Sequence, residues 1–116
     1  MSPNLPLPQP LPQPAPRVAY VDIPDIDGAT PLMLGARNGH TEVVRILLNA
    51  GALVNLENTN GDTALTLGAR NGHTVIVREL MAAGANVNHA NNNGETAMSL
   101  AARNGHVNVV DTLNGQ

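Results

Sequence analysis

The residues best suited to chemistry are histidines that recur at a fixed interval. His40, His73 and His106 stand 33 residues apart, and each ends an Asn-Gly-His tripeptide. Imidazole nitrogens can bind a metal ion or carry a proton near neutral pH. Packed helices of successive units lie about 8–10 Å apart, however, whereas each donor must lie within about 2.1 Å of a shared metal. We therefore predict that each ring hydrogen-bonds backbone groups at a turn, and we expect no metal and no cofactor.

Three arginines follow the same interval. Arg37, Arg70 and Arg103 each immediately precede an Asn-Gly-His tripeptide. A cation near the C-terminal end of a helix is stabilising by about 0.3–1 kcal/mol. Arginine is also enriched among the residues that dominate binding interfaces. The sequence leaves both roles open: a charge that serves its own helix, or a stripe that meets acidic groups of a partner.

Other signs of catalysis are missing from the sequence. There is no cysteine, no Gly-x-Ser-x-Gly nucleophile elbow, no phosphate-binding glycine loop and no His-Glu-x-x-His motif. The carboxylates between Asp22 and Asp111 are scattered, with no spacing that suggests an acid/base pair in a pocket. We therefore expect a protein that is not an enzyme.

Composition narrows the choice of partner. The chain has 116 residues and a net charge of −3, all six basic residues are arginine, and Tyr20 is the single aromatic residue. A chain without a basic cluster or aromatic platforms is poorly suited to nucleic acid or to an anionic membrane surface. No segment approaches the roughly 18 apolar residues of a spanning helix, and the N-terminus does not resemble a signal peptide. We expect a soluble, intracellular, monomeric protein.

The elements that position these residues repeat with the same period. Each 33-residue unit contains two short helical patterns. In the first unit they run from about Thr30, as N-cap, to Arg37 and from about Thr41 to Asn49. Helices shorter than about 12 residues are not stable alone in water, so they must pack on neighbouring units. Asn-Gly pairs at 60–61 and 93–94 predict a hairpin-like finger loop between units.

These motifs resemble the ankyrin repeat. The resemblance rests on Gly-x-Thr-Pro-Leu, then Ala-Arg-Asn-Gly-His-Thr-Glu-Val-Val-Arg-x-Leu-Leu, then Gly-Ala-x-Val-Asn, and it covers about residues 18–116. It implies an all-α fold, an ankyrin-repeat solenoid of stacked helix-turn-helix units with β-hairpin-like finger loops. One departure stands out. The usual histidine after Thr-Pro-Leu is replaced by Met33, Thr66 and Ser99, so the hydrogen bonds of that ring must be replaced or lost.

Two glycines also depart from the pattern. Gly35 and Gly68 occupy helical positions where the resemblance implies alanine, and each could cost about 1 kcal/mol. Alanine at either position should raise the melting temperature. A loss of stability would mean that the backbone there is not helical or that the site has no room for a methyl group.

The two ends differ from the middle. Residues 1–16 hold seven prolines, which predicts a polyproline II arm that either docks on the first repeat or serves as an SH3- or WW-type ligand. In the third unit Asn114 replaces an apolar residue, which fits either a polar cap or a cut array. The predicted division is a proline-rich arm (1–17) and a repeat domain (18–116), comprising the finger of a missing repeat (18–24) and repeats at about 25–57, 58–90 and 91–116.

The resemblance also implies where a partner binds. In similar proteins the variable finger positions and the exposed side of each first helix line a concave surface. We predict a protein–protein interaction module that binds another protein or peptide there, anchored at the apolar end of the first unit with the repeated arginines beside it. The alternatives are a natural or engineered scaffold without an evolved partner and an adaptor that uses the proline arm. The candidate contact residues are Pro24, Ile26, Asp27, Ala29, Met33, Arg37, Glu57, Thr59, Asn60, Asp62, Thr66, Arg70, Ala90, Asn92, Asn93, Glu95, Ser99 and Arg103.

Overall fold

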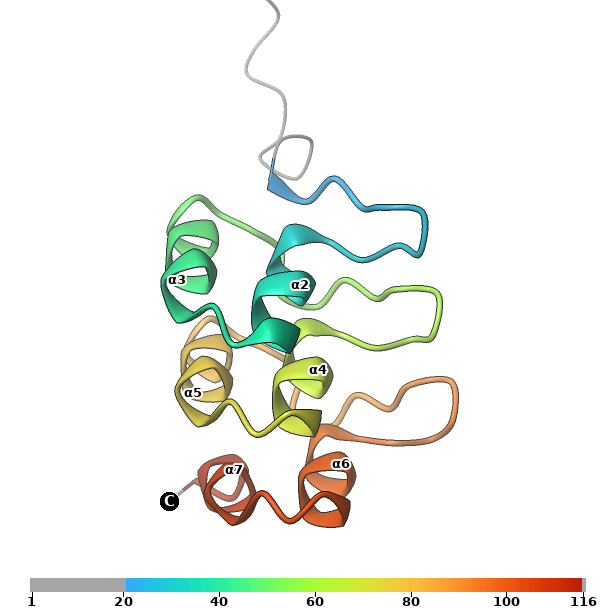
Figure 1. Cartoon of the computed structure of the whole chain (residues 1–116), viewed down its shortest axis with the longest axis vertical. Helices are drawn as coiled ribbons and strands as arrows, with labels where there is room; N and C mark the ends of the chain where they lie inside the picture. The colour runs from blue at the N-terminus through green and yellow to red at the C-terminus, as the bar shows by residue number, and fades with distance from the viewer. Residues whose placement is uncertain (1–20, 116) are drawn as a thin grey trace, which may run out of the picture.

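The computed structural model describes residues 21–115 as a stack of three helix pairs (Figure 1). The predicted all-α solenoid is confirmed, and within the described part of the chain the only β-type pairing is a single bridge between Ala90 and Thr96. The proline-rich arm and the start of the incomplete finger lie outside the described residues. The helices are α2 (Pro31–Asn38), α3 (Thr41–Asn49), α4 (Ala64–Arg70), α5 (Thr74–Ala82), α6 (Ala97–Arg103) and α7 (Val107–Leu113).

The helices form two layers. One layer contains α2, α4 and α6, and the other contains α3, α5 and α7. The loops project from the first layer, on the side away from the second layer (Figure 1). We call the loops at 22–30, 55–63 and 88–96 the first, second and third fingers, and each finger with the helix pair that follows it one repeat. No helix within residues 21–115 is long and apolar enough to cross a membrane.

The first helix of each pair starts at a capping threonine. The Thr30 hydroxyl accepts the N–H of Met33 at 3.2 Å, as the sequence predicts. In the second repeat the caps are reciprocal, because the Thr66 hydroxyl also accepts the N–H of Thr63 at 2.8 Å. Ser99 does the same for Thr96 in the third repeat. Hydroxyl groups therefore replace the absent histidine in two repeats, whereas the Met33 side chain is apolar and buried.

Short glycine turns join the two helices of each pair. Gly39 and Gly72 both have φ of 78°, a left-handed conformation that favours glycine. Space is also limited there, because a Cβ on Gly72 would lie 2.6 Å from Nδ1 of His106 in the next repeat. A side chain at this turn would strain the backbone and displace the histidine ring.

The histidines connect successive repeats. Nε2 of His73 lies 3.0 Å from the carbonyl oxygen of Arg37, and the Asn71 amide donates to the same oxygen at 2.9 Å. His106 and Asn104 bind the carbonyl of Arg70 in the same way, at 2.9 and 3.1 Å. Each ring therefore carries its proton on Nε2 and bonds to the last turn of the preceding first helix. The predicted hydrogen bonding of the ring is found at His73 and His106, with the bond running between repeats, but not at His40, whose exposed ring makes no hydrogen bond within residues 21–115.

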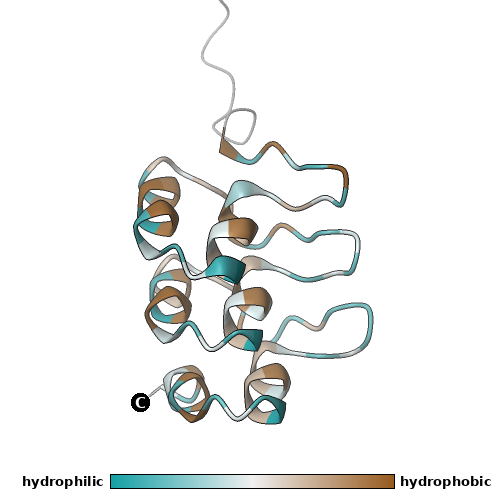
Figure 2. Ribbon diagram, in the orientation of Figure 1, coloured by the Kyte–Doolittle hydropathy of each residue, from teal (hydrophilic) through white to brown (hydrophobic). Residues whose placement is uncertain are grey.

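The core is aliphatic and continuous through the stack. Leu65, Ile76 and Leu80 of the middle repeat are almost completely buried, and they pack in one cluster with Leu32 and Val44 of the first repeat. Apolar residues concentrate on the helices, and the second and third fingers are mainly hydrophilic (Figure 2). Because the helices have only seven to nine residues, their stability depends on this shared burial.

Candidate binding surface

The fingers and the first helices form one surface, which we call the finger face. Each finger turns in the same way, because one side-chain oxygen of Asp25, Asn58 or Asn91 accepts two backbone N–H groups further along the loop. The distances are 2.9–3.0 Å in all three fingers. Short Asp and Asn side chains favour such turns because they can bond their own backbone. The equivalent side chains thus give three fingers of one shape.

Neighbouring fingers are hydrogen-bonded to each other. The Thr59 N–H donates to the carbonyl oxygen of Asp27, and the Asn92 N–H donates to that of Asn60, both at 3.0 Å. The Asn92 side-chain amide adds a bond of 2.9 Å to the carbonyl oxygen of Thr59. Side chains from all three repeats therefore share one supported surface.

Four of the predicted contact residues are buried. Ala29, Met33, Asp62 and Thr66 are 6%, 1%, 2% and 1% exposed, so the prediction that they face a partner is wrong. These positions lie where the first helix meets its finger and the next repeat, and neighbouring side chains cover them. Arg70 and Glu95 are half-buried. The exposed candidates are Pro24, Ile26, Asp27, Arg37, Glu57, Thr59, Asn60, Ala90, Asn92, Asn93, Ser99 and Arg103.

The buried Asp62 carboxylate organises a polar cluster in the second repeat. It lies 3.2 Å from Nη2 of Arg70, and it accepts hydrogen bonds from the Thr66 hydroxyl at 3.2 Å and the Asn91 amide at 2.9 Å. These three protein donors compensate for the burial of the charge. Sequence reasoning missed this cluster, although an acidic residue eight positions before the arginine was visible in two of the three units.

The third repeat carries a more open version of the same arrangement. Glu95 lies 2.6 Å from Nη1 of Arg103, and it accepts the Asn91 amide at 3.0 Å. The hydrogen bond from Asn91, followed by that from Arg103, lowers the pKa of the Glu95 carboxyl below its ordinary value. The Asn91 amide therefore joins the acidic groups of two repeats. Arg70 and Arg103 are therefore each paired with a carboxylate of their own repeat.

The first repeat has no such pair. Alanine stands at position 29, where the others carry an acid, and Arg37 is exposed and forms no ion pair within residues 21–115. The finger of this repeat is also the most apolar, with Ile26 96% and Ile23 60% exposed. Figure 2 shows hydrophobic colour at its tip, unlike the other two fingers. The finger face thus changes from aliphatic with an unpaired arginine to polar with internally paired charges.

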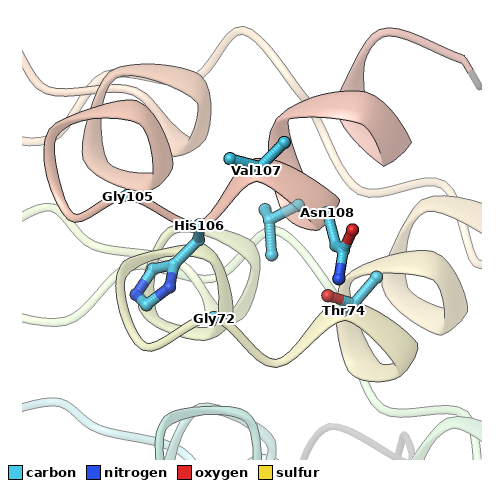
Figure 3. A pocket seen from close by; sticks show the side chains of 7 residues that line it. Gly72, Thr74, Gly105, His106, Val107 and Asn108 are labelled. Atoms are coloured by element: carbon cyan, nitrogen blue, oxygen red, sulfur yellow. The ribbon is translucent and has the colours of Figure 1, made fainter.

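A pocket of about 260 Å³ lies away from the finger face, between the glycine turns of the second and third repeats (Figure 3). His106, Thr74 and Asn108 contribute its polar groups, and it is partly open to solvent. The His106 ring points toward the turn at Gly72, and its Nε2 is already bonded to the Arg70 carbonyl. The pocket is therefore lined by backbone and short side chains, and its one imidazole ring is already hydrogen-bonded to the Arg70 carbonyl.

Three helix pairs, joined through the same backbone and side-chain groups at an interval of 33 residues, define a helical repeat protein with a continuous finger face. Comparison with known families agrees with this class: residues 32–115 match the family described as ankyrin repeats, in three copies. The chain belongs to the ankyrin repeat family, as its motifs predict. No curated protein matches the chain.

Proposed function

We propose that this protein is a non-enzymatic interaction module that binds a partner protein or peptide through the finger face. Ankyrin repeats are generally protein–protein interaction modules. The observation that carries the proposal is the exposure of large aliphatic side chains on the first finger, with Ile26 96% and Ile23 60% exposed. A few residues carry most of the binding energy at an interface, and burial of exposed aliphatic side chains such as these is favourable.

The fingers also favour binding because their shape is set before the partner arrives. The backbone bonds from Thr59 to Asp27 and from Asn92 to Asn60 tie the three loops together. A surface that is already ordered loses less conformational entropy on association. The finger face offers no exposed tryptophan or tyrosine, the types enriched in hot spots, so we expect affinities in the micromolar range.

Affinity capture with the intact chain tests the proposal. We expect Ile23→Ser combined with Ile26→Ser to abolish recovery of proteins that the wild-type chain retains. The matched control is Ile46→Ser, since Ile46 is 65% exposed but lies on α3, away from the fingers. A photo-crosslinker at Thr59 should join the same partner to the finger face.

Two other outcomes of that experiment point elsewhere. Recovery that is unchanged by the finger variants would contradict the proposal. Absence of any retained protein would favour the alternative of a scaffold without an evolved partner. Deleting residues 1–16 addresses the adaptor alternative, because a ligand arm should lose a partner when removed and leave the melting temperature unchanged.

A further inference from the structure

We propose that the first repeat docks a peptide segment in which a carboxylate side chain lies next to an aliphatic one. Arg37 binds the carboxylate, and the first finger, through Ile23 and Ile26, binds the aliphatic side chain. This inference deepens the proposed function and rests on it. It names the chemistry of the partner segment and the repeat that recognises it.

The first repeat lacks the acidic residue that pairs with the arginine in the other two repeats. Arg70 and Arg103 are each paired with a carboxylate eight residues earlier, at 3.2 and 2.6 Å. The equivalent residue for Arg37 is Ala29. The hydroxyl that supports the Asp62 carboxylate comes from Thr66, and its equivalent in the first repeat is Met33. Both groups that would hold an internal counter-ion for Arg37 are therefore replaced by apolar, buried side chains.

The backbone of Arg37 is nevertheless well anchored. Its carbonyl oxygen accepts hydrogen bonds from Asn71 at 2.9 Å and from Nε2 of His73 at 3.0 Å. The guanidinium is presented from this fixed point with its donors unused by any carboxylate of residues 21–115. A planar guanidinium matches a carboxylate through two parallel hydrogen bonds, which gives direction as well as affinity. Because Arg37 is exposed, an external carboxylate can approach its guanidinium from solvent and supply the negative charge that Asp62 and Glu95 supply in the other repeats.

The first finger sets the orientation of the segment. Asp27 is exposed at the finger tip beside Ile26, and it would repel a carboxylate placed there. The Asp25 carboxylate accepts the N–H groups of Asp27 and Ala29 within the turn. The acid of the ligand therefore lies toward α2, and the aliphatic side chain lies toward the tip. The same acidic residues, with the net charge of −3, favour a peptide over the phosphates of a nucleic acid.

The test is selection from a displayed library of random peptides on the wild-type chain. We expect the enriched sequences to contain Asp or Glu next to Leu, Ile, Val or Phe. Synthetic peptides from that pool should bind Arg37→Gln about tenfold more weakly, the loss expected for one charge-assisted hydrogen-bonded pair. Arg78→Gln is the matched control, because Arg78 is an exposed arginine of α5 outside the finger face. It should leave binding unchanged.

A second variant supplies the missing counter-ion without removing the arginine. Ala29→Asp combined with Met33→Thr copies the second repeat, and Asn58 is placed to donate as Asn91 does to Asp62. We expect this double variant to fold, as judged by its melting curve, and to bind acidic peptides as weakly as Arg37→Gln does. Asp27→Asn should instead strengthen them, because it removes a like charge.

Each remaining result contradicts the inference. Enriched peptides without acidic residues, equal binding to Arg37→Gln, or no enrichment at all would overturn it, and so would a single-stranded oligonucleotide that binds more tightly than the peptides. If the enriched peptides bind the Ile23→Ser and Ile26→Ser double variant more weakly than the wild-type chain, the proposed function stands and only the role of Arg37 fails. If they bind that variant equally well, both proposals fail.

Discussion

The first repeat and the two that follow share one backbone plan, but they use the same arginine differently. Arg70 and Arg103 are held by Asp62 and Glu95 of their own repeats, whereas Arg37 has Ala29 at the matching position. The buried member of the pair in the second repeat is Asp62, which is 2% exposed, while Arg37 and Arg103 are exposed. One residue eight positions away therefore decides whether the arginine is paired with a carboxylate of its own repeat.

Removal of the buried acid of the second repeat should have the largest effect on stability. Asp62→Ala should lower the free energy of unfolding by about 2–3 kcal/mol, because Arg70, Thr66 and Asn91 all lose their common acceptor. Chemical denaturation measures the loss. Glu95→Ala should cost less, since Glu95 is only half-buried. Equal losses for the two variants would show that burial does not distinguish the repeats.

The histidines give the next largest contrast. His106→Ala removes a bond to the Arg70 carbonyl and should destabilise the fold by about 1 kcal/mol. His40→Ala should have almost no effect, because His40 is exposed and makes no hydrogen bond through its ring within residues 21–115. Thermal melts of the two variants provide the check. A similar shift for both would mean that the loss comes from the turn itself.

The helical glycines Gly35 and Gly68 distinguish the first two repeats by the space around them. A Cβ on Gly68 would make ordinary contacts of 3.6 Å or longer with Ile76 and Val77, so Gly68→Ala should stabilise the protein by about 0.5–1 kcal/mol. A Cβ on Gly35 would lie 3.2 Å from Cγ2 of Val44. Gly35→Ala should therefore stabilise the protein clearly less than Gly68→Ala does, or destabilise it. Melting temperatures of both variants settle the order, and a larger gain at Gly35 would contradict the packing argument.

The smallest expected effect is a pH dependence specific to the third repeat. Hydrogen bonds from Asn91 and Arg103 lower the pKa of Glu95 from its ordinary value of 4.5. A carboxyl with a depressed folded-state pKa stabilises the protein above the unfolded value, and this contribution is lost as the pH falls through the folded value. Glu95→Gln should thus flatten the acid side of the stability curve below about pH 4.5. A curve that keeps its slope would contradict this assignment.

The architecture was predictable from the sequence because it depends on a repeated local pattern. The capping Thr30 and the helix from Thr41 to Asn49 fall where the sequence places them. The burial of Met33 and Asp62 was not predictable, because it depends on how closely each finger lies against its helix and the next repeat. The bond between Asn91 and Asp62 spans 29 residues. One local signal was available, since Thr63 and Thr66 have the spacing of a reciprocal cap, with Thr66 in place of the usual Glu or Gln.

The bonds that join the repeats at Arg37 involve its carbonyl oxygen, while its side chain is exposed. Every amino acid has that carbonyl, so Asn71 and His73 can hold the joint whatever side chain position 37 carries. Evolution or a protein engineer can therefore exchange this residue to obtain a new specificity without rebuilding the connection beneath it.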